Sequence, residues 1–203
     1  MLNVVVVDTG LGNVRSVVRA LEKASSRAKA VVTSDADAIA RADALVVPGQ
    51  GAFRDCAASL SKNGLGEAIK SSIAKGTNYL GICLGMQTLF ETSEEAPGCA
   101  GLAIFPGTVV KLRGGAGLKI PHVGWNTVDP ARGSWVLPRQ EYFYFVHSYV
   151  VAPRDAALAC GKTTHGETFV SAIEKDNVVA VQFHPEKSQR AGLALIERFL
   201  SRC

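Results

Sequence analysis

The sequence lacks the features that mark secreted, metal-binding and membrane-spanning chains. Its five cysteines are an odd set without a Cys-x-x-Cys pair, which argues against a disulfide framework and against a zinc site. No apolar run approaches the roughly 20 residues that a membrane helix needs. Met1 leads directly into an apolar stretch, without the basic leader of a signal peptide. We therefore expect a chain that works in the reducing cytoplasm, with no membrane and no metal.

The sequence also lacks a strong excess of either positive or negative charge. The formal net charge is only +4, and the lysines and arginines are scattered along the chain. Aromatic residues do not alternate with basic runs, as they do in many nucleic-acid-binding surfaces, so no nucleic-acid partner is expected. With 203 residues, 47% of them hydrophobic, the chain is long enough for one complete core. We therefore expect a single domain that spans residues 1–203.

The first half of the sequence alternates short apolar runs with amphipathic segments. Leu2–Val7 is apolar except at Asn3, as expected of a parallel strand that is buried on both faces. Asn13–Ala24 repeats its apolar residues at helical spacing. Further strands are expected at Lys29–Thr33 and Ala44–Val47, and further helices at Phe53–Leu60 and Leu65–Lys75. Repeated βα units predict a doubly wound, mostly parallel sheet with helices on both faces.

The second half is mostly β, with glycine and proline between the candidate strands. These strands are Thr108–Leu112, Trp125–Val128, Tyr142–Val151, Ala157–Lys162, Thr168–Glu174 and Val178–Phe183. A final amphipathic helix is expected at Gln189–Leu200, with Ser188 as its N-cap. The predicted fold is therefore α/β, with an additional antiparallel β section beside the parallel sheet.

A cysteine between two glycines is the most informative feature of the chain. The pattern Gly81-x-Cys83-x-Gly85 follows a short apolar strand. A helix is predicted to begin at Leu84. This arrangement is typical of a nucleophile elbow, with cysteine in place of serine. The glycines let strand and helix approach closely while Cys83 is held in a strained turn. The helix N-terminus favours the thiolate form of the cysteine.

A second motif, His184-Pro-Glu186, follows the last predicted strand. In extended geometry, residues i and i+2 point to the same side, so Glu186 can hold the His184 ring from behind. Cys83, His184 and Glu186 would then act as nucleophile, base and orienting acid. Sites in open α/β sheets form beyond the carboxyl ends of the strands, where Cys83 and His184 are both expected.

The tetrahedral intermediate of such a reaction needs hydrogen-bond donors for its oxyanion. One candidate is the backbone N–H of Leu84, the residue after the nucleophile. The other must come from a neighbouring strand end. The turn Pro48-Gly49-Gln50-Gly51 is suited to this, because two glycines let its backbone N–H groups turn inward. We choose the Gln50 N–H as the second donor.

The remaining cysteines and histidines are predicted to be structural. None of these cysteines has a glycine elbow, and no metal-ligand spacing joins the histidines. They are Cys56, Cys99, Cys160, Cys203, His122, His147 and His165. Two other functions share the elbow: a redox sensor with a peroxide-sensitive Cys83, and a hydrolase of esters or peptides. The first leaves His184-Pro-Glu186 without a role, and the second usually places its acid between nucleophile and histidine.

Taken together, these motifs resemble those of class I (triad) glutamine amidotransferases over nearly the whole chain. The segments GICLGMQ, around Cys83, and VQFHPEKS, around His184, carry the likeness to the class. Within the class, the chain is similar to the glutaminase subunits of imidazole glycerol phosphate synthases, from histidine biosynthesis. Three stretches carry this narrower likeness: Asp8–Ser16 (DTGLGNVRS), Lys119–Asn126 (KIPHVGWN) and Tyr144–Tyr149 (YFVHSY).

The resemblance implies a reaction and a partner. Cys83 would attack the side-chain amide of glutamine, and His184, supported by Glu186, would move the proton. Hydrolysis of the thioester would give glutamate, without a cofactor. Ammonia would pass to a (β/α)8-barrel cyclase subunit, as a heterodimer, which makes imidazole glycerol phosphate and aminoimidazole carboxamide ribotide. By the same likeness, the glutamine site is lined by Gly51, Gln87, Ser148 and Tyr149, and the partner side and ammonia route by Asn13, Lys119, Pro121 and Trp125.

Two residues depart from the family pattern. Thr9 stands where the family commonly has tyrosine, and Gln50 where it commonly has valine. A backbone donor does not depend on its side chain, but Gln50 could change how easily the Gly49–Gln50 peptide reorients when a partner binds. The nearest alternative function is a glutaminase that serves anthranilate, aminodeoxychorismate, guanylate or pyridoxal phosphate synthesis. Its chemistry would be unchanged and only the partner would differ.

Overall fold

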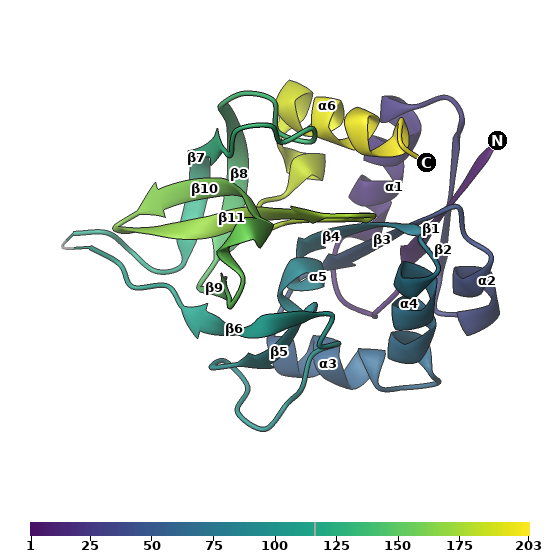
Figure 1. Cartoon of the computed structure of the whole chain (residues 1–203), viewed down its shortest axis with the longest axis horizontal. Coiled ribbons are helices and arrows are strands. Elements are labelled where there is room, and N and C mark those ends of the chain that lie inside the picture. The colour runs from purple at the N-terminus through teal and green to yellow at the C-terminus, as the bar shows by residue number, and fades with distance from the viewer. Residues whose placement is uncertain (116) are drawn as a thin grey trace.

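The computed structural model describes residues 1–115 and 117–203 and is built around one long mixed sheet (Figure 1). The parallel part of this sheet has the order β2-β1-β3-β4-β12. Its strands are β1 (Leu2–Val7), β2 (Ala28–Thr33), β3 (Ala44–Gly49), β4 (Asn78–Cys83) and β12 (Val178–Val181). The predicted mostly parallel sheet is confirmed, and its last strand is added from the far end of the chain.

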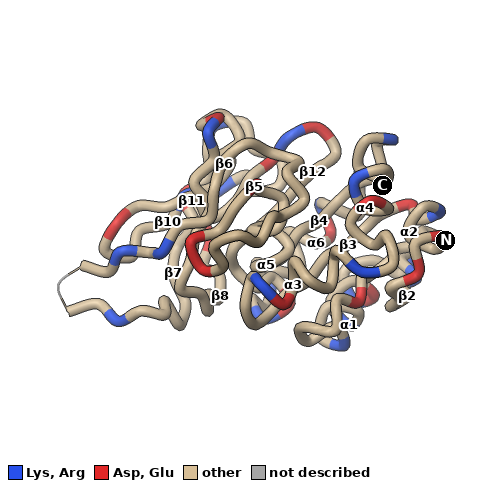
Figure 2. Tube along the Cα trace, turned by 90° about the horizontal axis from the view of Figure 1, so that it is seen from below, with Lys and Arg blue, Asp and Glu red and all other residues tan. Residues whose placement is uncertain are grey.

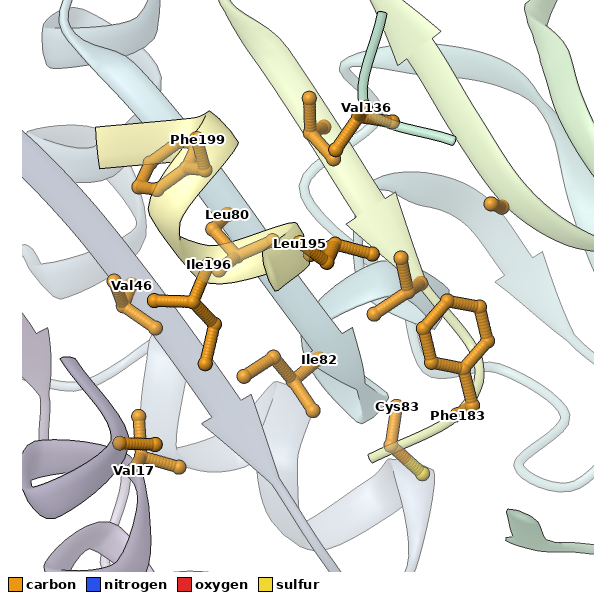
Figure 3. Packing of buried hydrophobic residues seen from close by; sticks show 14 of the residues in the cluster. Val17, Val46, Leu80, Ile82, Cys83, Val136, Phe183, Leu195, Ile196 and Phe199 are labelled. Atoms are coloured by element: carbon orange, nitrogen blue, oxygen red, sulfur yellow. The ribbon is translucent and has the colours of Figure 1, made fainter. Parts of the chain in front are cut away.

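Helices cover both faces of the parallel strands (Figure 1). On one face lie α1 (Val14–Ala24) and α6 (Gln189–Leu200), and on the other α2 (Ala36–Ala40), α3 (Phe53–Leu60) and α4 (Leu65–Ala74). Along β1, Val4 and Val6 pack toward the first face and Val5 and Val7 toward the second. Because alternate side chains enter two separate cores, the strand is apolar from Val4 to Val7. Figure 3 shows the first core, where Ile196 of α6 lies over Val46 and Leu80.

The antiparallel part continues the sheet in the order β11-β10-β7-β8, starting from β12. These strands are β11 (Glu167–Lys175), β10 (Ala159–His165), β7 (His122–Pro130) and β8 (Glu141–His147). A side layer of β5 (Phe90–Ser93), β6 (Phe105–Lys111) and β9 (Tyr149–Pro153) joins it through β9 and β11. The expected antiparallel section is therefore present, in two connected layers.

Several boundaries differ from the predicted ones. The single strand predicted at Tyr142–Val151 is divided at Ser148 into β8 and β9. The division arises because the chain changes neighbours there: His147 pairs with β7, whereas Tyr149 pairs with β6. The strand predicted at Ala157–Lys162 begins with a 3-10 turn at Ala156–Leu158 and forms β10 only from Ala159. Neither α2 nor β5 was expected, because both are too short to show a period.

The distribution of charge agrees with the composition. In Figure 2, basic and acidic residues are spread along the trace, and neither sign gathers on one element. Among the residues that the structure describes, no helix is both long and apolar enough to cross a membrane.

Candidate active site

Cys83 lies at the sharp junction between β4 and α5 (Leu84–Gln87), with a φ of 56° and a ψ of −106°. A positive φ is costly for a residue with a Cβ, by about 1–3 kcal/mol, and is retained mainly where the surroundings enforce it. The flanking glycines allow this turn. A Cβ on Gly81 would lie 2.5 Å from the Gly85 carbonyl oxygen, and a Cβ on Gly85 would lie 1.8 Å from the Val47 carbonyl oxygen. The predicted elbow is therefore formed, although its helix is only one turn long.

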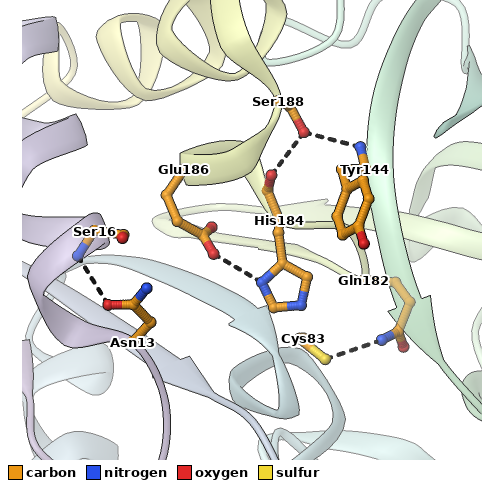
Figure 4. A network of polar contacts seen from close by, with 8 residues as sticks. All are labelled: Asn13, Ser16, Cys83, Tyr144, Gln182, His184, Glu186 and Ser188. Carbon is orange, nitrogen blue, oxygen red and sulfur yellow. Dashed lines mark hydrogen bonds and ion pairs between the residues drawn. The ribbon is translucent and has the colours of Figure 1, made fainter. Parts of the chain in front are cut away.

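His184 follows β12 and is held by Glu186. The two side chains, each only 2% exposed, meet through His184 Nδ1 and Glu186 Oε1 at 2.8 Å. Because a carboxylate oxygen accepts, Nδ1 carries the hydrogen, and Nε2 faces away from Glu186. Among the described residues, Nε2 is buried without a hydrogen-bond partner. In Figure 4 the imidazole lies between the Glu186 carboxylate and the Cys83 sulfur.

The route by which Glu186 reaches the ring differs from the expected one. We expected an extended segment, but Pro185–Lys187 forms a 3-10 turn, with proline at its first position. Proline fixes φ near −65°, which suits such a turn. The main chain of the turn is also attached to β8, because the His184 N–H donates to the Tyr144 carbonyl oxygen at 2.9 Å.

The electrostatic environment of His184 favours its cation. Burial by itself lowers the pKa of His184, but the neighbouring Cys83 thiolate and the Glu186 carboxylate outweigh it and raise that pKa to about 9. An imidazolium facing a thiolate is the resting form expected of a nucleophilic cysteine with an adjacent base.

A pocket of about 410 Å³ opens at this junction and collects most of the residues that the sequence singled out. Its lining includes Cys83 and His184, together with Gln50 and Leu84 of the expected oxyanion hole. It also includes all four residues of the expected glutamine site, which are Gly51, Gln87, Ser148 and Tyr149. Of the residues expected along the ammonia route, it includes Pro121. Asn13, Lys119 and Trp125 are not part of this lining, and Glu186 stays behind His184.

The turn expected to complete the oxyanion hole lies beside the elbow. Gly49, the last residue of β3, is paired in register with Cys83. A Cβ on Gly49 would lie 2.5 Å from the Leu84 Cβ, so the end of β3 is in close contact with the start of α5. Across the turn, the Gln50 backbone nitrogen would lie 3.5 Å from a Cβ on Gly12. The loop after β1 therefore packs against the expected oxyanion donor.

Three more residues belong to this site: Glu95 and Gln182, which sequence reasoning passed over, and His147, which it predicted to be structural. Glu95 is the acidic member of the lining, and its Oε2 accepts from the Phe53 N–H at 3.0 Å. Gln182 is fully buried and places its amide nitrogen 3.5 Å from the Cys83 sulfur. His147 lines the pocket as well. Only Gln182 carried a usable signal, since it is a polar residue in an otherwise apolar run two residues before His184.

Exposed apolar side chains continue from the pocket along the hairpin of β7 and β8. Trp125 is 47% exposed, and Val123 and Tyr142 are also exposed on the same face. The Trp125 ring meets the Tyr144 ring edge to face, with centroids 6.1 Å apart. Pro121 is exposed and also lines the pocket, so it marks the point where the pocket meets this apolar face.

Two other residues expected near the partner lie outside the pocket. Asn13 caps α1, since its side-chain oxygen accepts from the Ser16 N–H at 3.3 Å (Figure 4). Lys119 is exposed, and its carbonyl oxygen lies 3.1 Å from the ring of His165. Nothing in these contacts prevents either residue from meeting another chain.

The residues expected to be structural have no metal-site geometry within the described part of the chain. Cys56 and Cys160 are buried, and burial raises the pKa of each thiol to about 12. The rings of His122 and His147 are both buried and share a hydrogen bond of 3.0 Å. Burial lowers the pKa of His122 to about 4 and that of His147 to about 3, so both are neutral.

Comparisons with known proteins identify the family. The family model for class-I glutamine amidotransferases matches residues 5–203. The HisH subunit of imidazole glycerol phosphate synthase from Aquifex aeolicus is 48% identical, over 98% of this chain and 96% of its own. That of Syntrophotalea carbinolica is 46% identical, over 97% and 98%.

Solved structures agree on the fold. A crystal structure of a glutamine amidotransferase has a TM-score of 0.75 at 19% identity, covering 97% of each chain. A chain in the structure of PurLQS from Thermotoga maritima has a TM-score of 0.75 at 16% identity, covering 99% of this chain and 98% of its own. The chain thus belongs to the class-I glutamine amidotransferase family and, within it, to the HisH subunits of imidazole glycerol phosphate synthase.

Proposed function

We propose that this chain hydrolyses glutamine to glutamate and ammonia at Cys83, as the glutaminase subunit of an imidazole glycerol phosphate synthase in histidine biosynthesis. The observation that carries the proposal is the meeting of the strained cysteine, the buried His184–Glu186 pair and a pocket of about 410 Å³. The proposal assigns all of residues 1–203 to one glutaminase domain. The odd set of free cysteines supports a cytoplasmic setting.

In the first half-reaction, the Cys83 sulfur attacks the side-chain amide carbon of glutamine, and the carbonyl π electrons move to the oxygen. The backbone N–H groups of Gln50 and Leu84 are the proposed donors to this oxyanion. As the intermediate collapses, the carbon–nitrogen bond breaks and His184 Nε2 gives its proton to the leaving nitrogen. Ammonia departs and a glutamyl thioester remains on Cys83.

In the second half-reaction, the now neutral His184 takes a proton from water, and the hydroxyl oxygen attacks the thioester carbon. The carbon–sulfur bond then breaks, which releases glutamate and restores the thiolate beside the imidazolium. Glu186 stays ionised throughout and keeps Nδ1 protonated, so that Nε2 exchanges the proton in both halves. The net reaction consumes one glutamine and one water.

Substrate recognition is assigned to the other lining residues. Glutamine carries an α-ammonium group, and Glu95 is the acidic side chain available to pair with it. The buried Oε1 atom of Gln87 has no partner among the described residues and can accept a hydrogen bond from the substrate. Gly51, Ser148 and Tyr149 complete the expected contacts along the pocket wall.

The partner side is assigned to the apolar face formed by Val123, Trp125 and Tyr142. Exposed aromatic and aliphatic residues on one rigid hairpin are typical of the centre of a protein interface. We propose that a (β/α)8-barrel cyclase subunit covers this face and forms a heterodimer with the chain. Ammonia would leave the pocket past Pro121, with Asn13 and Lys119 on the same side, and would be used by the cyclase to make imidazole glycerol phosphate.

The test uses the reconstituted complex with two nitrogen sources. Cys83→Ala should reduce glutamine-dependent synthesis to background, because no nucleophile remains. Synthesis from added ammonium salts should stay at the wild-type rate, because the cyclase is untouched. Both rates are measured as formation of imidazole glycerol phosphate.

Two outcomes would contradict the proposal. Retained glutamine-dependent synthesis would exclude Cys83 as the nucleophile. Failure of the wild-type chain to support synthesis with the barrel subunit, together with success beside an anthranilate or aminodeoxychorismate synthase, would reassign the partner. Cys99→Ala is the matched control, since it removes a partly buried free thiol outside the pocket and should leave both rates unchanged.

A further inference from the structure

The Cys83 sulfur has a second polar neighbour besides His184. Gln182 directly follows β12, and its backbone N–H donates to the Ser171 carbonyl oxygen at 2.9 Å. Its side chain is fully buried, and its Nε2 donates to the Cys83 sulfur at 3.5 Å (Figure 4). Burying a primary amide is costly unless its groups are paired, so this contact requires an explanation.

The orientation of the Gln182 amide is fixed by a chain of donors and acceptors. The Tyr149 carbonyl oxygen can only accept, and the Gln87 side chain contacts it at 3.1 Å. That contact must therefore be made by the Gln87 amide nitrogen. The same nitrogen lies 3.0 Å from the nearer end of the Gln182 amide, which must accept and is therefore Oε1. The remaining Gln182 group, the NH₂, is left facing the sulfur.

We propose that Gln182 is a further catalytic residue of this site. The amide N–H of Gln182 stabilises the Cys83 thiolate. Gln87, which is itself bonded to the Tyr149 carbonyl oxygen, holds the Gln182 amide in this orientation. The catalytic meaning of this contact rests on the function proposed above. The contact with the sulfur itself is tested separately from glutamine hydrolysis.

The chemistry calls for such a donor at two points. A hydrogen bond to the charged form of a group favours that form, so the N–H favours thiolate over thiol. In the second half-reaction the thiolate is the leaving group, at the moment when His184 is engaged with water. Gln182 carries no proton that it can transfer, and so it can stay with the sulfur through both halves. His184 is thereby free to exchange its proton with the substrate.

The test measures how fast iodoacetamide alkylates Cys83 in the full chain between pH 5 and pH 10. The sulfur–carbon bond forms as iodide leaves, and only the thiolate reacts appreciably. Gln182→Met keeps the length of the side chain and removes the donor. At pH 7 we expect alkylation about tenfold slower than in the wild type, the size of one hydrogen bond to a charged group. Toward pH 10, where loss of the donor no longer changes how much of Cys83 is ionised, the rates for Cys83 should converge.

Peptide-resolved mass spectrometry supplies the internal reference, because Cys99 is alkylated in the same sample. Gln140→Met is the matched control: Gln140 is exposed, bonds to Asp129 and does not line the pocket around Cys83. Gln87→Met should slow Cys83 alkylation in the same direction but less, because it frees the Gln182 amide to rotate without removing its donor. If Gln182→Met does not fold, the alkylation rate of Gln87→Met still tests the proposal.

Superimposable pH profiles for wild type, Gln182→Met and Gln87→Met would overturn the proposal. A uniform slowing at all pH values would do the same, because it would indicate restricted access to the sulfur rather than a smaller thiolate fraction. Neither result depends on glutaminase activity. Failure of this inference is therefore distinguishable from failure of the proposed function.

Discussion

His184 and His147 both line the pocket around Cys83, but they come from different halves of the sheet. His184 follows the parallel strand β12, and His147 ends the antiparallel strand β8. Both are nearly fully buried. Surroundings nevertheless move their pKa values in opposite directions, to about 9 for His184 and to about 3 for His147.

The difference comes from the charge of the neighbours. Glu186 and Cys83 offer His184 two groups whose negative charge is stabilised by an imidazolium. The pKa of His147 is lowered first by burial and then by the neighbouring His122 ring. Among the leading effects, only the hydrogen bond to the Tyr149 carbonyl oxygen raises it. Burial alone therefore does not predict the role of a histidine. The charge of its hydrogen-bond partners decides whether it can carry a proton.

The antiparallel pair forms a chain of neutral rings with a fixed direction. The Tyr149 carbonyl lies 3.0 Å from His147 Nδ1 and can only accept, so Nδ1 carries the hydrogen. His147 Nε2 is then the acceptor for His122 Nδ1–H at 3.0 Å, and His122 Nε2 accepts from Asn126 at 3.3 Å. A proton added to His147 would face the His122 N–H directly. This arrangement holds backbone in place and is unsuited to moving protons.

The largest expected effect comes from making the same substitution, histidine to asparagine, at positions 184 and 147 and comparing the two variants. Asparagine retains a donor near the place of Nδ1 and removes Nε2. His184→Asn should lower kcat for glutamine hydrolysis in the complex by about 10²–10⁴-fold, the usual contribution of a general acid–base group. His147→Asn should lower it by less than about tenfold, because its Nε2 only accepts from His122.

The measurement is steady-state glutamate release with the partner subunit present. Equal losses at the two positions would remove the distinction drawn between them. The loss of kcat in Glu186→Ala is expected to lie between the losses in the two histidine variants, since Glu186 orients and stabilises the His184 ring without exchanging the proton. A loss as large as that of His184→Asn would contradict this orienting role.

A smaller effect is expected on acid stability. An unfolded histidine titrates near pH 6.5, whereas His147 and His122 titrate at about 3 and about 4 in the folded chain. Between pH 6.5 and pH 4 the unfolded chain therefore binds more protons, and the free energy of unfolding decreases as the pH falls. Each such histidine contributes a slope that approaches about 1.4 kcal/mol per pH unit.

Urea unfolding of the wild type and His147→Asn at pH 7, 6 and 5 measures this slope. The variant should lose less stability over the interval, by roughly the contribution of one proton, while carboxylates contribute equally to both chains. Parallel dependence on pH in the two proteins would mean that His147 is not held neutral by the fold. The urea m-value serves as the control, because a change in it would indicate a change in the unfolding transition itself.

The two regions also differ in how much of them the sequence predicts. Apart from α2, the parallel strands and their helices follow from local patterns: α3 and α6 have the predicted bounds, and the Cys83 elbow is specified by two glycines within five residues. The elbow and the His184–Glu186 pair were readable because each motif is short and its chemistry depends on near neighbours.

The rest depends on contacts between distant segments. Gln182 and Gln87 are 95 residues apart, and Gln182 and Cys83 are 99 residues apart. The break at Ser148 arises where the chain exchanges β7 for β6 as its neighbour, which leaves no trace in hydrophobic spacing. Hydrogen-bond partners of this kind become visible only when the sheet is assembled.

Ser188 joins the two regions. It is the N-cap residue of α6, as expected, but its side chain makes no capping bond. Its hydroxyl instead donates to the His184 carbonyl oxygen at 2.6 Å and accepts from the Tyr144 N–H at 3.0 Å. With the bond from the His184 N–H to the Tyr144 carbonyl, this fastens the catalytic turn to β8, the strand that ends in His147.

Ser188→Ala should have the smallest effect of the series, a loss of about 1–2 kcal/mol in the free energy of unfolding, because a buried N–H is left without its acceptor. Urea unfolding measures it. The control is Ser61→Ala, which removes a hydroxyl bonded to a carbonyl near the surface end of α3 and should cost less than about 0.5 kcal/mol. Equal losses would mean that the Ser188 bridge between the turn and β8 stabilises the fold no more than a hydrogen bond at the surface does. In that case the two histidines would be positioned independently, each by its own half of the sheet.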